Sequence, residues 1–473
     1  MSSMKCIALQ LTTLYLLAGC AHFEARPLAP ERTAADFEAR TLDNPELKVF
    51  LEKNLKGELA QWPLQEWDFR TLTLVALYYH PSLDVARARW AIAQAGVTTA
   101  GGRPNPTVGL SPQYTSNAES GVSPWVASIT FDIPIETAGK RAYRIAQAEQ
   151  VSESARLGIA AQAWQVRSTL RASLLDHVAA QRRAAMLQDV FDTQQQVLNL
   201  LEGRLAAGAI AVPDVTPARV ALIKTQTDLV EAKRQVVEGR AHVAEALGLP
   251  LRAIEGRALK LDLSPAVDAG GDLESAEVRS QALHHRADIL AGLAEYAASQ
   301  SAIRLEVAKQ YPDINLGTGY EYDQGSHKWG LGVGAELPVL NRNQGPIAEA
   351  EARRTETAAR FLALQAKVIA EIDLALAGSA AVQDQLRQID TLLETQRKQA
   401  QSIEALVGAG GGDQLELCSA GLEVRLAELA RLNMLVKAQQ ALGQLEDAVQ
   451  VPFDALRSVE QGRPAQAMKE RKP

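Results

Sequence analysis

The segment WVASITFDIPIETAGKR, residues 125–141, changes character halfway along its length. In its first half apolar and polar residues alternate, so a strand here would be apolar on one face and polar on the other. Its second half, after Pro134, carries a glycine and two basic residues and leads into a long stretch rich in alanine and glutamine. The segment is therefore either a strand that delivers a Gly-Lys loop to a phosphate, or a two-faced strand that runs into a long helix.

The spacing of the residues argues against the phosphate loop. A P-loop needs a glycine five residues before Gly139 and a serine or threonine after Lys140, and this chain has Pro134 and Arg141 at those places. A helix N-terminus also disfavours cations, so the two basic residues do not stand there for helix stability. They would contact either acidic groups of a neighbouring subunit or lipid phosphate, and the sequence leaves both alternatives open.

The start of the chain has the pattern of an export signal. Lys5 precedes a short apolar stretch that ends in Leu-Ala-Gly-Cys at 17–20, which is similar to the lipobox of bacterial lipoproteins. Residues 1–19 are therefore expected to be a lipoprotein signal peptide, and Cys20 to be the acylated residue that anchors the chain in the outer membrane. An ordinary signal with a chance cysteine is the alternative.

Composition narrows the classes of function. The net charge of −7 argues against a nucleic-acid-binding protein. If Cys20 is lipidated, Cys418 has no disulfide partner in the mature chain. The seven histidines are scattered, and neither His-x-x-x-His nor Cys-x-x-Cys occurs, so we expect no metal site and no cofactor. No motif of catalytic residues has a recognisable context, so no enzymatic activity is expected.

The chain contains a tandem repeat. The sequence IAQAE at 145–149 recurs as IAEAE at 347–351, displaced by 202 residues (347 − 145), and the same displacement relates Gly208 to Gly410. The agreement continues upstream when two small insertions or deletions are allowed for, and there Trp125 corresponds to Trp329. The expected divisions are a signal peptide at 1–19, an N-terminal collar at 20–69, a first repeat at 70–250, a connector at 251–275, a second repeat at 276–452 and a disordered tail at 453–473.

Each half has the order helix, strand, strand, long helix, long helix. The opening helices are expected at about 72–102 and 277–309. Two segments of period-two alternation follow, each about ten residues long, which suits a tilted strand crossing a bilayer. The proline-free stretch from 140 to 205 then predicts a helix roughly 100 Å long at about 1.5 Å per residue. A glycine-rich turn ends each such helix.

Strands with one apolar and one polar face, attached to helices of this length, fit a wall between lipid and water. An open sheet edge is not tolerated in lipid, and four strands are too few to close a barrel, so the chain must oligomerise. Three copies would supply twelve strands. The side chains expected to face lipid are Trp125, Ile129, Phe131, Trp329, Leu331 and Val333.

These features resemble the TolC-like outer membrane factors, the exit ducts of tripartite efflux and secretion systems. The resemblance covers about 70–452 and rests on the duplicated order of elements and on the turn RLAAGAIAVPDVTPAR. In that turn the family pattern is matched by Arg204, Gly208, Asp214, Val215, Ala218 and Arg219. The segment IPIETAGKR, with its counterpart LPVLNRNQG, is similar to the heavy-metal-efflux, CzcC-like branch.

The resemblance implies a mixed α/β membrane protein with a TolC-like fold. A homotrimer would form a twelve-stranded barrel in the outer membrane, continued by a helical barrel across the periplasm. The glycine-rich turns would be periplasmic tips that meet an adaptor protein, with Arg204, Gly208 and Gly410 at the contact. The family places acidic residues around the closed aperture, and Asp214 and Glu416 match that position. For Asp214 a helix N-cap is the alternative.

The expected function is passive conduction of divalent heavy-metal cations out of the cell. The partners would be the periplasmic adaptor, a proton-driven inner-membrane pump and the lipid of the outer membrane. The same duct serving drug efflux or type I protein secretion is one alternative. A non-conducting periplasmic coiled-coil scaffold or adaptor is another.

Overall fold

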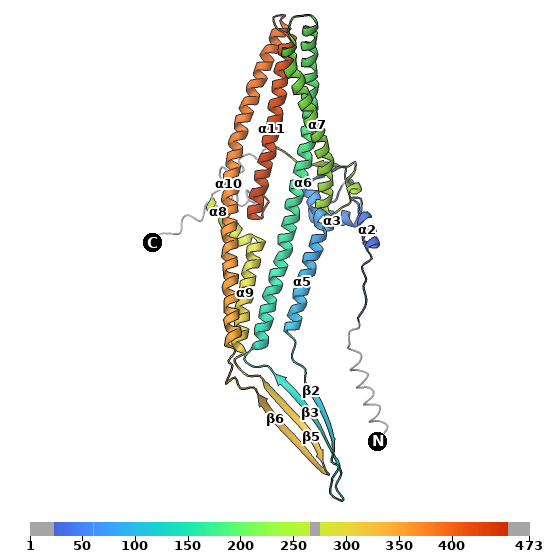
Figure 1. Cartoon of the computed structure of the whole chain (residues 1–473), viewed down its shortest axis with the longest axis vertical. Coiled ribbons are helices and arrows are strands. Elements are labelled where there is room, and N and C mark those ends of the chain that lie inside the picture. Colours follow the sequence, from blue (N-terminus) through green and yellow to red (C-terminus); the bar gives the residue numbers. More distant parts are fainter. Residues whose placement is uncertain (1–22, 60, 265–274, 453–473) are drawn as a thin grey trace, which may run out of the picture.

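The computed structural model describes residues 23–59, 61–264 and 275–452. The expected signal peptide, Cys20, part of the expected connector and the tail at 453–473 lie outside these residues. The molecule is a long rod of helices with a four-stranded sheet at one end and two helical hairpin turns at the other (Figure 1). Within the described residues, no helix combines the length and the apolar character needed to cross a membrane.

Helices and strands follow one another in an order that occurs twice along the chain. The helices are α2 (Pro30–Glu38), α3 (Pro45–Leu55), α4 (Phe69–Tyr79), α5 (Pro81–Ala100), α6 (Lys140–Ala206), α7 (Val212–Leu247), η1 (Leu251–Ile254), α8 (Ser275–His285), α9 (Ala287–Ala308), α10 (Gln344–Gly408) and α11 (Gln414–Val449). The strands are β1 (Glu66–Asp68), β2 (Thr107–Tyr114), β3 (Trp125–Ile135), β4 (Ala258–Lys260), β5 (Ile314–Asp323) and β6 (Ser326–Ala335).

The four long strands form one antiparallel sheet in the order β2-β3-β5-β6. Its central pair, β3 and β5, joins the two halves of the chain, while β2 and β6 are its edges. The register places Val108, Phe131, Thr318 and Leu331 in one row across the sheet. Because side chains alternate along each strand, the apolar residues of all four strands gather on one face.

The helices next to the sheet repeat the order of the strands. In Figure 1 α5, α6, α9 and α10 lie side by side, each continuing toward the strand it precedes or follows. Contacts join α5 to α6, α6 to α9 and α9 to α10. Helix α6 has 67 residues and α10 has 65, so α6 extends for roughly 100 Å at about 1.5 Å per residue. The expectation of very long helices is confirmed.

The opening helix of each half is broken in two, so the predictions of single helices at 72–102 and 277–309 are wrong. His80, between α4 and α5, has φ −70° and ψ 120° because the residue before a proline is pushed out of the helical region. Arg286, between α8 and α9, has φ −63° and ψ 128° without a proline after it. Its buried guanidinium donates to the Ala448 carbonyl at 2.7 Å, which holds the break against the end of α11.

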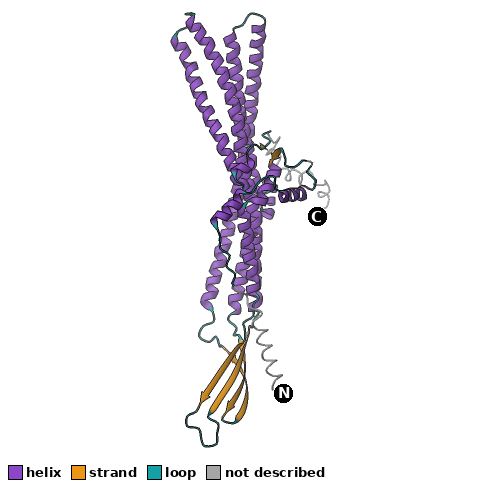
Figure 2. Cartoon of the chain, turned by 90° about the vertical axis from the view of Figure 1, so that its right-hand side faces the viewer, coloured by secondary structure: helices purple, strands orange, loops and turns teal. Residues whose placement is uncertain are grey.

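The largest apolar core lies at the waist of the rod, away from the sheet. Trp67 of β1 and Leu47 of α3 pack with Leu72 of α4, Leu174 of α6 and Leu247 of α7, and all five side chains are fully buried. Strand β1 pairs in parallel with β4 beside this core. The described parts of the expected collar and connector therefore fold together around the middle of the helices (Figure 2).

Candidate functional site

The apolar face of the four-stranded sheet is exposed in the described part of the chain. Trp329 is 82% exposed and Leu331 is 73% exposed, and Val333 follows on the same face of β6. The other three expected lipid-facing residues, Trp125, Ile129 and Phe131, lie on this same face of β3. Ile129 is half-buried, while the other two are exposed. All six residues thus share one face, and no described residue outside the sheet buries this face.

Aromatic side chains gather on this face toward the hairpin loops. The rings of Tyr114 and Trp125 are 5.1 Å apart between centroids, and those of Tyr320 and Trp329 are 4.8 Å apart. Tyrosine and tryptophan concentrate where a membrane meets water, because their rings are apolar and their edges polar. The loop ends of the strands therefore have the chemistry of a membrane interface.

Lys140 is held by its own chain at the junction between the sheet and the helices. Its side chain is only 9% exposed, and its Nζ lies 2.7 Å from Oδ1 of Asp313, which is 43% exposed. The backbone N–H of Thr137 donates to the same oxygen at 2.9 Å. For Lys140, the two alternatives of a neighbouring subunit and lipid phosphate are both wrong, because Asp313 precedes β5 of the same chain.

The other basic residues of this junction cap the end of α5. Arg141 and Arg144 together donate to all three carbonyl groups of residues 100–102, at 2.7 to 3.0 Å. Arg144 also binds both carboxylate oxygens of Glu136, at 2.6 and 3.1 Å. Cations at a helix C-terminus satisfy its free carbonyl groups and complement its dipole. Arg141 of the GKR motif and Arg144, one turn later, thus hold the end of α5 against the start of α6.

The two glycine-rich turns form the tips of the helical hairpins. Gly208 follows α6 with φ 73°, and Gly410 follows α10 with φ 81°. These left-handed conformations favour glycine. A Cβ added at either glycine would have no heavy atom within 4 Å, apart from its nearest chain neighbours. Within one chain the tips are therefore open surfaces.

An ion pair joins the two tips. Arg204, in the last turn of α6, pairs with Asp413, which caps the start of α11 by accepting from the backbone N–H of Leu415 at 3.1 Å. Its hydrogen bond to Arg204 holds the pKa of the Asp413 carboxyl below its usual value. Sequence reasoning selected Arg204 but missed Asp413. An aspartate directly after GlyGlyGly and before a helical pattern is an N-cap signal that could have found it.

The two expected aperture residues lie in the first turns of the returning helices. Asp214 is in the first turn of α7, where its Oδ2 accepts from the backbone N–H of Ala211 at 2.8 Å. Asp214 is thus the third residue of the helix and caps it by accepting from Ala211, which is itself the N-cap residue, so Asp214 is not the N-cap that was its alternative. Glu416 lies in the first turn of α11 and is exposed. Both residues therefore lie beside the tips.

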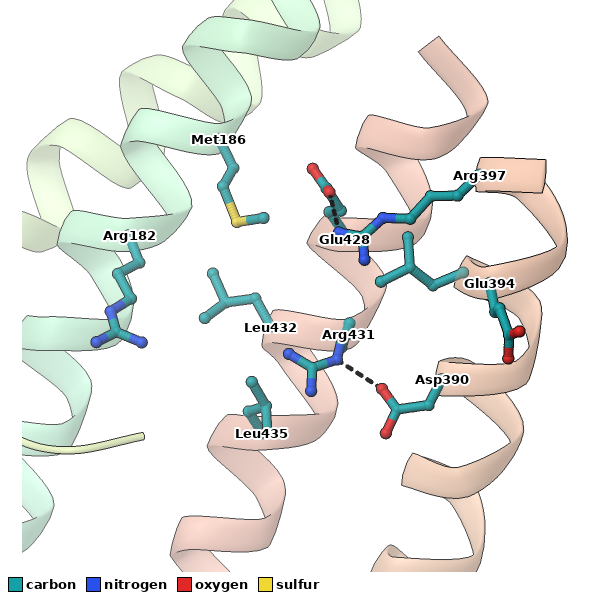
Figure 3. Close-up of a pocket in the computed structure, with 10 residues that line it drawn as sticks. Arg182, Met186, Asp390, Glu394, Arg397, Glu428, Arg431, Leu432 and Leu435 are labelled. Atoms are coloured by element: carbon teal, nitrogen blue, oxygen red, sulfur yellow. Dashed lines mark hydrogen bonds and ion pairs between the residues drawn. The ribbon is translucent and has the colours of Figure 1, made fainter. Parts of the chain in front are cut away.

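Below the tips, a cleft of about 530 Å³ lies between α6, α10 and α11 (Figure 3). Arg397 pairs with Glu428 at 2.7 Å, and Arg431 pairs with Asp390 at 2.5 Å, so the cations of α10 and α11 are already neutralised. Met186 of α6 lines the opposite side. In the described parts of the chain, no group of three or more His, Cys, Asp or Glu side chains could hold a metal ion.

Comparison with known proteins identifies the family. A family model described as "Outer membrane efflux protein" matches residues 74–249 and again 278–449. The chain belongs to the outer membrane efflux protein family. The family expectation drawn from the tip turn and from the repeated order of elements is thereby confirmed.

A curated relative and two solved structures give the nearer context. The cobalt-zinc-cadmium resistance protein CzcC of Cupriavidus metallidurans is 27% identical over 234 residues, which are 49% of this chain and 54% of CzcC. The match thus spans about half of that relative. The outer-membrane channel OprN has a TM-score of 0.68 at 17% identity, covering 92% of this chain and 98% of OprN. CusC has a TM-score of 0.65 at 18% identity, covering 83% and 94%. The chain has the TolC-like fold of these outer membrane channels.

Proposed function

We propose that this chain is the outer membrane exit duct of a tripartite efflux system. In this proposal three copies close a twelve-stranded barrel in the membrane and continue it as a helical barrel across the periplasm. The duct conducts passively and catalyses no reaction. A proton-driven inner-membrane pump and a periplasmic adaptor deliver cargo to the tips, and acylated Cys20 anchors each chain.

The observation that carries this proposal is that the sheet and the helix layer are open at the same two edges. Strands β2 and β6 end the sheet, and α5 and α10 end the layer of helices. A rotation that pairs β6 with β2 of the next copy also brings α10 against α5 of that copy. These helix edges carry bare apolar side chains, with Ile92 of α5 72% exposed and Leu362 of α10 62% exposed. Contacts of this head-to-tail kind form a ring when the rotation from copy to copy closes, as a threefold rotation does.

Divalent heavy-metal cations are the proposed cargo. The segment IPIETAGKR supports this proposal, as does the relative CzcC, whose name assigns it to cobalt, zinc and cadmium resistance. The metal would pass through as substrate rather than reside in the protein. The measurement is growth in Co²⁺, Zn²⁺, Cd²⁺ and Ni²⁺: a deletion strain as resistant as its parent would contradict this choice of cargo.

The proposed adaptor contacts are the tips. The hairpins end at Arg204, Gly208 and Gly410. The space around a Cβ added at either glycine is free of described heavy atoms within 4 Å, apart from its nearest chain neighbours. The ring of Asp214 and Glu416 carboxylates around the aperture is part of the same proposal. Replacing Gly208 and Gly410 together by glutamine is expected to abolish metal resistance while the trimer persists. Full resistance in this variant would place the adaptor elsewhere.

The decisive experiment for the duct is the mass of the assembled protein. Detergent-extracted protein measured by light scattering should have three times the monomer mass after correction for bound detergent. A monomer that is soluble without detergent would refute the duct and favour a periplasmic scaffold.

A further inference from the structure

Charged side chains are few on the polar face of the sheet. The strands β2, β3, β5 and β6 contain only four acidic or basic residues other than histidine, all on this face. Three of them form one cluster, in which Lys328 Nζ lies 3.4 Å from Oε1 of Glu321 and 2.6 Å from Oδ2 of Asp323. The side chain of the fourth, Asp132, makes no hydrogen bond or ion pair with any described residue. Its negative charge therefore has no partner in the described part of the chain.

Asp132 also stands beside bare backbone. The register places it in a row with Thr107, Gly317 and Gly332. A Cβ added at Gly317 or Gly332 would meet only the carbonyl oxygen of the facing glycine, at 3.7 and 3.8 Å. The next row toward the loops consists of Gly109, Thr130, Gly319 and Gly330. The neighbouring row on the other side adds only the uncharged Asn315 of β5 and Gly334 of β6. No charged side chain thus flanks the Asp132 carboxylate on the β5–β6 side, and the cluster containing Lys328 begins two rows away.

We propose that Asp132 sets the charge preference of the duct in its strand region, favouring cations over anions. The inference rests on the proposed function, because the polar face lines a passage only where three copies close the sheet. Threefold symmetry then places three Asp132 carboxylates at one level. Rings of acidic side chains favour cations. Here no positive side chain of the same row offsets them.

Coulomb's law gives the expected size of the effect. A cation about 10 Å from each of three carboxylates in water is favoured about eightfold before screening. A Debye length of about 10 Å at 0.1 M salt lowers this factor to about twofold. An anion is disfavoured by the same factor. The three Asp132 charges should therefore raise the cation-to-anion permeability ratio about fourfold at 0.1 M salt, and by more in dilute salt.

The test is the zero-current potential of the purified full-length trimer in a planar bilayer that separates two KCl concentrations. All variants carry Asp214→Asn and Glu416→Gln, so that the proposed aperture ring contributes no carboxylate. In this background Asp132→Asn is expected to lower the K⁺-to-Cl⁻ permeability ratio about fourfold at 0.1 M salt. The control Glu321→Gln with Lys328→Gln removes one charge of each sign and should leave the ratio unchanged.

A relocated carboxylate separates charge from structure. Asn315 lies on the same face as Asp132, one row nearer the helices, opposite Gly334. Asn315→Asp in the Asp132→Asn background should therefore restore the ratio. A ratio that Asp132→Asn leaves unchanged, or that Asn315→Asp fails to restore, overturns the inference. If trimers that carry only Asp214→Asn and Glu416→Gln conduct no ions, the proposed duct is overturned, and the inference falls with it.

Discussion

The pair of Lys140 and Asp313 makes an asymmetric prediction about stability. Lys140 is 9% exposed and Asp313 is 43% exposed, so water can solvate one partner but not the other. Asp313→Asn leaves a buried ammonium without its counter-ion, which for buried pairs costs about 3–5 kcal/mol. Lys140→Met leaves a carboxylate that water reaches and that still accepts from Thr137. Its cost should be about 1–2 kcal/mol, closer to that of a partly exposed pair.

Thermal unfolding of the detergent-solubilised protein, followed by tryptophan fluorescence, checks this order. For a chain of 473 residues, an unfolding entropy of about 2.1 cal/mol/K per residue gives a shift of roughly 1 °C per kcal/mol, so Asp313→Asn should lower the midpoint by about 3–5 °C and Lys140→Met by about 1–2 °C. The double variant Lys140→Met/Asp313→Asn should recover most of the loss, because no buried charge remains. If Lys140→Met costs as much as Asp313→Asn, or if the two losses simply add, the reasoning from burial is refuted.

Three other variants test packing, the assignment of faces and pH dependence. A methyl group at Gly443 would overlap the guanidinium of Arg171, which donates to a backbone carbonyl of α11 at 2.7 Å. Gly443→Ala should therefore cost about 1–3 kcal/mol of unfolding free energy in denaturant titration, and a neutral result would contradict this contact. Leu331→Asp places a charge on the expected lipid face and should abolish membrane assembly, as measured by fractionation. Gly330→Asp, one residue earlier on the polar face and with open space for its Cβ, should be tolerated, and equal effects would mean that the faces are misassigned. Burial, followed by the charge of Arg240, lowers the pKa of His177, which is fully buried. The unfolded chain then binds a proton that the folded one resists, so thermal stability should fall as pH drops below about 6.5. His177→Asn should reduce that slope, and an unchanged slope would assign it to other groups.

The strands and long helices could be predicted because their signals are local. Alternation marks β3 from Trp125 to Ile135, and the proline-free stretch after Gly139 marks α6, which begins at Lys140. The break at Arg286 could not be predicted. It lacks a proline, and its cause is a hydrogen bond to the carbonyl of Ala448, 162 residues away.

In the candidate site, too, the features with a local sequence signal could be predicted and those set by long-range contacts could not. Alternation alone places Phe131 and Leu331 on one face, because period two leaves a strand residue no other choice. The partner of Lys140 lies 173 residues away, at Asp313, and no spacing in the sequence relates the two. Burial of Lys140 had no local signal either, since two basic residues beside a glycine usually mark a solvated turn. Long-range pairs of this kind are set by the assembled junction and become visible only there.

The two sheet–helix junctions show what the duplication has kept and what it has changed. Each long helix starts after a residue in the left-handed conformation, Gly139 with φ 73° in the first half and Asn343 with φ 60° in the second. In the first half, guanidinium groups satisfy the carbonyls that end α5. In the second half, the amide of Asn343 donates to the carbonyl of Glu306 at 2.8 Å, near the end of α9. The C-terminal ends of α5 and α9 both need donors, because the last carbonyl groups of a helix have no partner within the helix. The backbone turn and the need for a donor are therefore common to both repeats, while the donor to the helix-terminal carbonyl is a charged guanidinium in the first repeat and a neutral amide in the second. Screening by salt should weaken the contacts of the first junction more than those of the second.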